Sequence, residues 1–196
     1  MQHYGLPTRL LDITKNPLVA LYFACESQAD CYGEVVLISA DEQTVKYPQS
    51  DTVSILASLP LFSYEKQEMF RYLAQDELIS DLEFNEKVSL LLHEIRLEKP
   101  AFKADMKKSD LLDSFVVYAL KNNKRIIKQD GVFILCGLLD EKNSLNRLKY
   151  KRNGKTVVML VENKEKLLTE LDDFGVNRAA LFPEIDNVSG YIKNKY

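Results

Sequence analysis

The sequence predicts an α+β fold with a mixed or antiparallel sheet and a helical insertion in its middle. Apolar, strand-like runs occur toward both ends of the 196-residue chain, whereas residues 52–102 contain no convincing strand pattern. The composition, 46% hydrophobic and 28% charged, is that of a globular protein with an ample core. The length suits one domain, 1–196, that includes the helical insertion 52–102.

The N-terminal part begins with a loop and a short extended piece at residues 9–13. A helix that ends near residue 27 follows, because Asn16 is a good N-cap and Pro17 suits the first turn. The helix is apolar nearly all round, so we expect it to be buried on most sides. The continuous apolar run at residues 33–40 predicts a strand in the centre of a sheet.

The middle of the chain has helical spacing throughout, in the runs DTVSILASL, EKQEMFRYLAQ and DLEFNEKVSLLLHEIRLEK. The apolar residues of the last run share one helical stripe, formed by Phe84, Val88, Leu91, Leu92 and Ile95. His93 falls on the opposite side, so we expect a solvated histidine rather than a ligand.

The C-terminal part returns to strands. Apolar runs at residues 114–120, 131–139 and 155–162 predict strands, and KEKLLTELDDFG predicts a helix with Gly175 as its C-terminal cap. The runs NRAALF and NVSGYIK predict short helical turns around Pro183.

Charge and cysteine content restrict the functional classes. The net charge of −3 and the pI near 5.5 argue against a protein that coats nucleic acid or an anionic membrane. No apolar run is long enough to span a membrane, so we expect a cytoplasmic protein with no membrane partner. Three cysteines without a metal-type spacing indicate a reducing compartment, with Cys25 and Cys136 buried and Cys31 exposed.

The standard catalytic motifs are missing from the sequence. There is no GxxxxGK[ST], GxGxxG or GxSxG segment. With only His3 and His93, a histidine-rich metal site cannot be built, and we predict no metal ligands.

The opening run QHYGLPTRLLDITKNPLVALYFA places demanding polar residues ahead of the apolar helix. The candidate ligand-binding residues in it are His3, Tyr4, Gly5, Thr8, Arg9, Asp12, Thr14 and Asn16. They lie near the positive end of the helix dipole, where a phosphate or carboxylate can bind. A structural interpretation uses the same residues: Arg9 pairs with Asp12, Asn16 caps the helix, and Tyr4 and Tyr22 pack in the core. Both interpretations stay open.

The run NNKRIIKQDGVF is the second candidate. Arg125 and Gln129 share a face if the run forms one helical turn, and Gly131 allows an unusual backbone angle or a close approach. An amide beside an arginine suits a nucleobase, an amide or a ribose, but such a loop can equally satisfy its own backbone.

A basic run between residues 142 and 155 is the third candidate, and it includes the turn signal Asn153–Gly154. A solvated hairpin explains it. Nucleic-acid binding is the alternative that the acidic composition disfavours.

Three segments together resemble the FRG domain family. The opening run is similar to the family pattern QHxGxPTRLLDWTxNPLxALYFA, with Ile13 where tryptophan is common. NNKRIIKQDGVF resembles the second family signature, and GVNRAALFPEIDNVSGYIK resembles the usual ending. The Phe-Arg-Gly motif that names the family stands upstream of the QHYG segment and does not occur here. We therefore expect a single FRG domain that lacks its N-terminal part.

A weaker resemblance connects these motifs to ADP-ribosyltransferases, which bind NAD in a split-sheet fold. Their motifs run from an arginine through a Ser/Thr segment to [EQ]-x-E, and the Phe-Arg-Gly motif that is missing here, PTRLLDIT and QDG fall in a similar order. The resemblance implies that Gln129 matches the first position of [EQ]-x-E and that Gly131 occupies the position of the catalytic glutamate. Because glycine cannot orient a ribose, the resemblance implies binding without efficient transfer.

The leading hypothesis is a nucleotide- or NAD-binding, ADP-ribosyltransferase-like domain, active as a bacterial toxin or a phage-defence effector. It predicts that Arg9 and Gln129 converge on one pocket. The alternative hypothesis is a non-enzymatic protein-interaction module. It predicts an exposed apolar patch on residues 52–102 that contacts a protein partner, and no polar pocket near Arg9.

Overall fold

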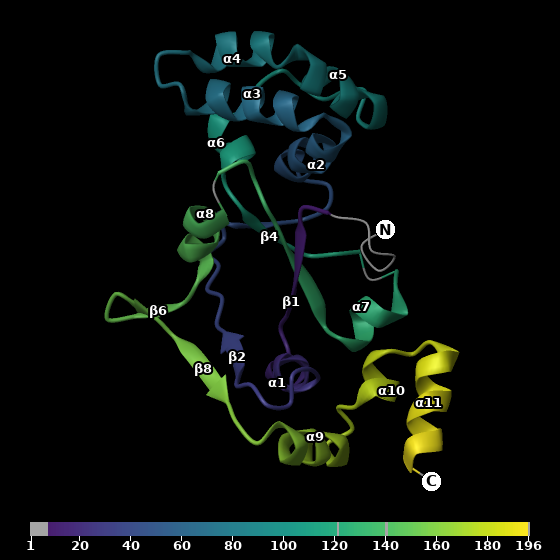
Figure 1. Cartoon of the computed structure of the whole chain (residues 1–196). Helices are drawn as coiled ribbons and strands as arrows, with labels where there is room; N and C mark the ends of the chain where they lie inside the picture. Colours follow the sequence, from purple (N-terminus) through teal and green to yellow (C-terminus); the bar gives the residue numbers. More distant parts are fainter. Residues whose placement is uncertain (1–7, 121, 140, 196) are drawn as a thin grey trace. The chain divides into compact units, whose positions relative to one another are not determined.

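The computed structural model describes residues 8–120, 122–139 and 141–195 (Figure 1). The described chain divides into two compact units. The first unit contains residues 8–11, 40–118 and 134–148, and the second unit contains the remaining residues. Two strands, β1 (Leu10–Thr14) and β5 (Gly131–Leu135), have residues in both units.

The first unit is mainly helical. Its remaining elements are β3 (Val45–Lys46), α2 (Asp51–Ser58), η2 (Leu59–Leu61), α3 (Tyr64–Gln75), α4 (Asp81–Lys87), α5 (Ser89–Glu98), α6 (Lys108–Leu112), β4 (Phe115–Val117) and α8 (Glu141–Leu148). Figure 1 shows helices α2 to α6 gathered in one group. The predicted helical character of residues 52–102 is therefore confirmed.

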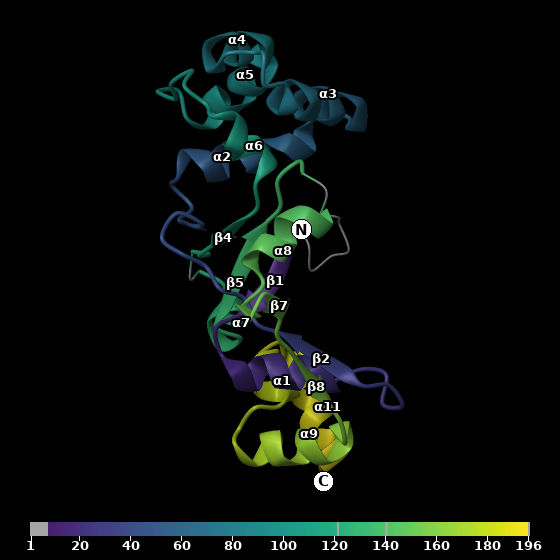
Figure 2. The same ribbon diagram turned by 90° about the vertical axis from the view of Figure 1, so that its left-hand side faces the viewer.

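The second unit combines short strands with helices. Its remaining elements are α1 (Pro17–Cys25), β2 (Gly33–Val36), α7 (Lys124–Lys128), β6 (Lys151–Arg152), β7 (Lys155–Thr156), β8 (Val158–Val161), α9 (Lys164–Asp173), α10 (Arg178–Leu181) and α11 (Ile185–Lys195). Figure 2 shows α1 beside β2 and β8, and these contacts belong to the unit's core.

The main sheet has four strands in the order β1-β5-β4-β3. Strands β3 and β4 are parallel, with Val45 opposite Val116. Two hydrogen bonds show that β1 and β5 run antiparallel. The Cys136 N–H donates to the Arg9 carbonyl at one end of the pair, and the Lys15 N–H donates to the Asp130 carbonyl at the other end. A mixed sheet with a helical middle is the predicted α+β fold.

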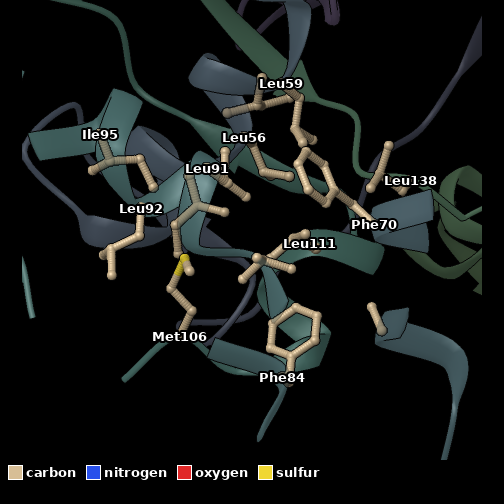
Figure 3. Packing of buried hydrophobic residues seen from close by; sticks show 14 of the residues in the cluster. Leu56, Leu59, Phe70, Phe84, Leu91, Leu92, Ile95, Met106, Leu111 and Leu138 are labelled. Atoms are coloured by element: carbon tan, nitrogen blue, oxygen red, sulfur yellow. The ribbon is translucent and has the colours of Figure 1, made fainter. Parts of the chain in front are cut away.

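The core of the first unit follows the predicted helical stripe. Phe84, Val88, Leu91, Leu92 and Ile95 are all buried. They pack with side chains of α2, α3 and α6, among which Leu56, Phe70 and Leu111 are fully buried (Figure 3). The predicted run forms two helices, α4 with Phe84 and α5 with Leu91, Leu92 and Ile95, and His93 on α5 is exposed, as predicted.

Helix α1 corrects the prediction of burial on most sides. It begins at the predicted N-cap, Asn16, but only Val19, Tyr22 and Cys25 are buried. Leu18 and Phe23 are 39% and 40% exposed. The buried residues are three apart and form one stripe, and α1 packs against α9, β2 and β8.

Strand β2 corrects a second prediction, because it does not lie in the centre of a sheet. Within the described chain it pairs with β8 alone, with Gly33 opposite Val161 and Val36 opposite Val158. Gly33 and Val35 are buried while Glu34 and Val36 are exposed, which is the alternation of a half-buried strand. The apolar run hid this alternation because both faces carry valine.

The other C-terminal predictions are confirmed with different lengths. The three predicted strands are shorter in the structure, where they correspond to β4, β5 and the pair β7 and β8. The last predicted helical turn is longer and is the eleven-residue helix α11. Helix α9 ends at a left-handed Gly175, whose N–H donates to the Asp172 carbonyl while that of Val176 donates to the Leu171 carbonyl. The hairpin between β6 and β7 has positive φ at Asn153 and Gly154, as the turn signal predicts.

The cysteines follow the prediction except at one position. Cys25 is buried and Cys31 is exposed, whereas Cys136 is half-buried because the strand ends at Leu135, one residue earlier. None of the helices in the described chain has the length and apolar character needed to cross a membrane.

Candidate ligand pocket

A pocket of about 690 Å³ opens in the first unit beside the start of β1. Three chain segments line it, at the entry to β1, along α3 with the preceding turn, and after β5. The lining residues are Thr8, Arg9, Leu10, Leu11, Pro60, Tyr64, Gln67, Glu68, Cys136, Gly137, Leu138, Leu139 and Leu145. Its lining mixes leucines with a few polar groups.

Arg9 is held at this pocket by groups of both neighbouring segments. Its Nη1 donates to the Gly137 carbonyl at 3.0 Å and to the Cys136 carbonyl at 3.4 Å. Its Nη2 donates to the Gln67 side-chain oxygen. Several fixed acceptors orient the plane of the guanidinium, which keeps its charge at any physiological pH.

Helix α3 supplies the other polar groups of the pocket. The Gln67 amide nitrogen donates to the Phe62 carbonyl at 2.8 Å, which orients the amide oxygen toward Arg9. Glu68 accepts two hydrogen bonds from Arg71, at 3.0 and 2.5 Å, and this carboxylate raises the pKa of Arg71. Tyr64, at the start of α3, is 77% exposed. The pocket thus combines a fixed cation, an amide, a carboxylate paired with Arg71 and an accessible aromatic ring.

Two residues of the opening run have structural partners in the second unit. The Thr14 hydroxyl donates to the Gln129 carbonyl at 2.7 Å and accepts from the Asn16 N–H at 3.0 Å. The Asn16 side chain accepts from the Leu18 N–H at 3.0 Å, which caps α1. The bond from Leu18 matches the structural interpretation of Asn16, whereas the structural partners of Thr14 were not predicted. Asp12 is exposed on β1.

The second candidate segment forms α7, and its two predicted side chains share one face. The Gln129 amide nitrogen donates to the Leu181 carbonyl at 3.1 Å, and the Arg125 guanidinium carbon lies 4.4 Å from the centre of the Phe182 ring. Both contacts are made to α10 or the residue after it. The unusual backbone angle predicted at Gly131 occurs instead at Asp130, with φ of 45°. A Cβ on Gly131 would come within 3.4 Å of Ile126.

The remaining predicted residues are placed as follows. His3, Tyr4 and Gly5 lie outside the described residues. Arg9 belongs to the first unit and Gln129 to the second, so their convergence on one pocket stays a prediction.

The sequence identified Thr8 and Arg9 but missed the rest of the pocket wall. Tyr64 and Gln67 belong to an amphipathic helix, and Cys136 to Leu139 follow a strand, so neither segment has a functional signature of its own. The exposure of Tyr64 at the first position of α3 is visible only in the structure.

The comparisons with known proteins bear on the opening run. The family model of the FRG domain matches residues 1–32. No curated protein and no solved structure matches the chain significantly. The match confirms the resemblance for the segment that contributes Thr8 and Arg9 to the pocket.

Proposed function

We propose that this chain, whose residues 1–32 match the FRG domain, binds a nucleotide in the pocket beside Arg9. The observation that supports the proposal is the pocket itself. Its volume of about 690 Å³ is in the range of small-molecule sites. A fixed guanidinium suits a phosphate oxygen, and the exposed Tyr64 ring offers a face for a base.

NAD and ADP-ribose are the first candidate ligands, because the motif order is similar to that of ADP-ribosyltransferases. The same resemblance puts Gly131 at the position of the catalytic glutamate. The proposed activity is therefore binding, with inefficient transfer of ADP-ribose. A role as a bacterial toxin or phage-defence effector extends this proposal to the biological setting.

The test is thermal unfolding with NAD, ADP-ribose, ATP and GMP, each added separately. A ligand at a hundredfold excess over its dissociation constant stabilises the folded state by about 2.7 kcal/mol. For a chain of this length we expect a shift of roughly 5 to 10 °C in the melting temperature.

A pair of tyrosine variants separates pocket binding from general effects. Tyr64 and Tyr72 both lie on α3 and are 77% and 63% exposed, but only Tyr64 lines the pocket. We expect Tyr64→Ala to weaken nucleotide binding at least fivefold and Tyr72→Ala to leave it within twofold. If no nucleotide shifts the melting temperature, or if both variants bind like the unaltered chain, the pocket is not a nucleotide site.

The alternative, a protein-interaction module, is favoured by a different observation. Several large apolar side chains of the helical middle are exposed, including Leu61, Leu78, Leu82 and Leu97, and Leu78 is 94% exposed. The alternative predicts that Leu78→Lys together with Leu82→Lys abolishes association with a protein partner and leaves any nucleotide binding intact. Self-association measured by sedimentation at increasing concentration is the first assay, because it needs no identified partner.

A further inference from the structure

The second unit contains an arginine pair around one aromatic ring. The guanidinium carbon of Arg125 lies 4.4 Å from the centre of the Phe182 ring, and that of Arg178 lies 5.6 Å from it. The two guanidinium carbons are therefore at most about 10 Å apart. Phe182 is only 9% exposed and packs in the core of α1, α9 and α10, so the ring is a rigid support.

The two arginines differ in what neutralises them. Arg178 donates from Nη1 to the Glu26 carboxylate at 3.1 Å and from Nε to the Asn187 side-chain oxygen at 3.3 Å. Arg125 forms no ion pair with any residue in the described part of the chain. Its Nε is buried and has no hydrogen-bond partner among the described residues. An arginine stays charged in proteins, so Arg125 brings a positive charge whose donors are incompletely used.

The surroundings of Arg125 add positive charge. Lys124 and Lys128 lie on the same short helix, and both are exposed. Asp130, the acidic residue that follows, forms an ion pair with Lys15 at 3.6 Å. The Gln129 amide holds the end of this helix to the Leu181 carbonyl, so the position of Arg125 relative to Phe182 is fixed.

We propose that Arg125 anchors an anion site that takes the phosphate group of a ligand and that shares no residue with the lining of the pocket beside Arg9. The two terminal Nη groups of a guanidinium can donate in parallel to two phosphate oxygens, and the contact with the Phe182 ring orients the guanidinium plane. The residues of this site all belong to the second unit.

The test is calorimetric titration of the whole chain with pyrophosphate. A separate titration with succinate, a dicarboxylate, shows whether the site prefers phosphate to carboxylate. Arg125→Ala removes the anchor, and Arg125→Lys keeps its charge but loses the paired donors. Lys128→Ala is the matched control, because it removes one positive charge from the same helical turn. We expect pyrophosphate to bind, Arg125→Ala to weaken binding at least tenfold, Arg125→Lys at least fivefold, and Lys128→Ala less than twofold.

Several results would overturn the proposal. Absence of pyrophosphate binding, or binding unaffected by Arg125→Ala, would mean that Arg125 only packs on Phe182. Equal losses in Arg125→Ala and Lys128→Ala would mean diffuse attraction by a basic turn. If succinate binds as tightly as pyrophosphate, the site does not select phosphate and the proposed phosphate specificity is wrong. If Arg125→Ala proves unfolded by circular dichroism, the Arg125→Lys variant decides between these results.

Discussion

Replacing Asn85 by alanine is expected to cost the first unit much of its stability. Asn85 is 5% exposed and lies on α4. Its amide nitrogen donates to the Met106 carbonyl at 2.9 Å, and its side-chain oxygen accepts from the Met106 N–H at 3.0 Å. The one side chain thus satisfies both backbone groups of a buried residue 21 positions away.

The size of the effect follows from the groups left without partners. Alanine at position 85 leaves the buried N–H and C=O of Met106 unsatisfied, at about 1 to 3 kcal/mol each. Alanine has a better helix propensity than asparagine, which offsets roughly 0.5 kcal/mol of the loss in the free energy of unfolding. We therefore expect a loss of about 3 kcal/mol in the free energy of unfolding, within the range of buried polar substitutions.

The assay is urea-induced unfolding followed by far-UV circular dichroism, because the chain contains no tryptophan. Glu86→Ala, on the exposed neighbouring position, is the control and is expected to change stability by less than about 0.5 kcal/mol. Asn85→Asp adds a second check, since only a protonated aspartic acid can donate to Met106 and its deficit should shrink as the pH falls. A loss below about 1 kcal/mol for Asn85→Ala would refute this account of the bond.

Three further predictions concern single positions, each measured by the same urea unfolding. Asn16→Ala removes the cap on the Leu18 N–H and should cost about 1 kcal/mol; an unchanged midpoint would show that water replaces the cap. Gly175→Ala forces alanine into a φ of +75° and should cost about 1 kcal/mol, with no contribution from crowding because nothing lies within 4 Å. Burial, followed by the nearby Glu26 carboxylate, raises the pKa of Tyr22 from 10.0 to about 12, so the folded state keeps a proton that the unfolded state loses. Stability should fall by about 2 to 3 kcal/mol between pH 10 and 12, and Tyr22→Phe should lack this part of the decline.

Local rules predicted most elements of this fold from the sequence. Period and capping located the stripe that contains Phe84 and Ile95, the start of α1 at Asn16 and the end of α9 at Gly175. They failed where an element is apolar on every side. The residues of α1 cannot indicate that only the face with Tyr22 is covered, because that depends on where α9 and β2 pack.

The candidate site was predicted in part for the same reason. Arg9 belongs to a recognisable run, but its acceptors lie on α3 and beyond β5, separated from it by 58 and 128 residues. Gln67 has nothing local that marks it as a partner. Contacts between residues so far apart in the sequence are set by tertiary packing, and the local pattern of a single sequence does not predict it.

Arg9 has two roles that mutation at Arg9 alone cannot separate. The guanidinium joins the Gly137 carbonyl to the Gln67 side chain, so Arg9→Ala removes bonds within the first unit as well as a pocket cation. Loss of nucleotide binding in that variant would therefore follow from either role. Tyr64 lines the same pocket with an exposed ring, and truncating an exposed side chain costs little stability. A binding defect in Tyr64→Ala with unchanged unfolding would consequently assign the pocket to a ligand, whereas a defect confined to Arg9→Ala would assign the arginine to the fold.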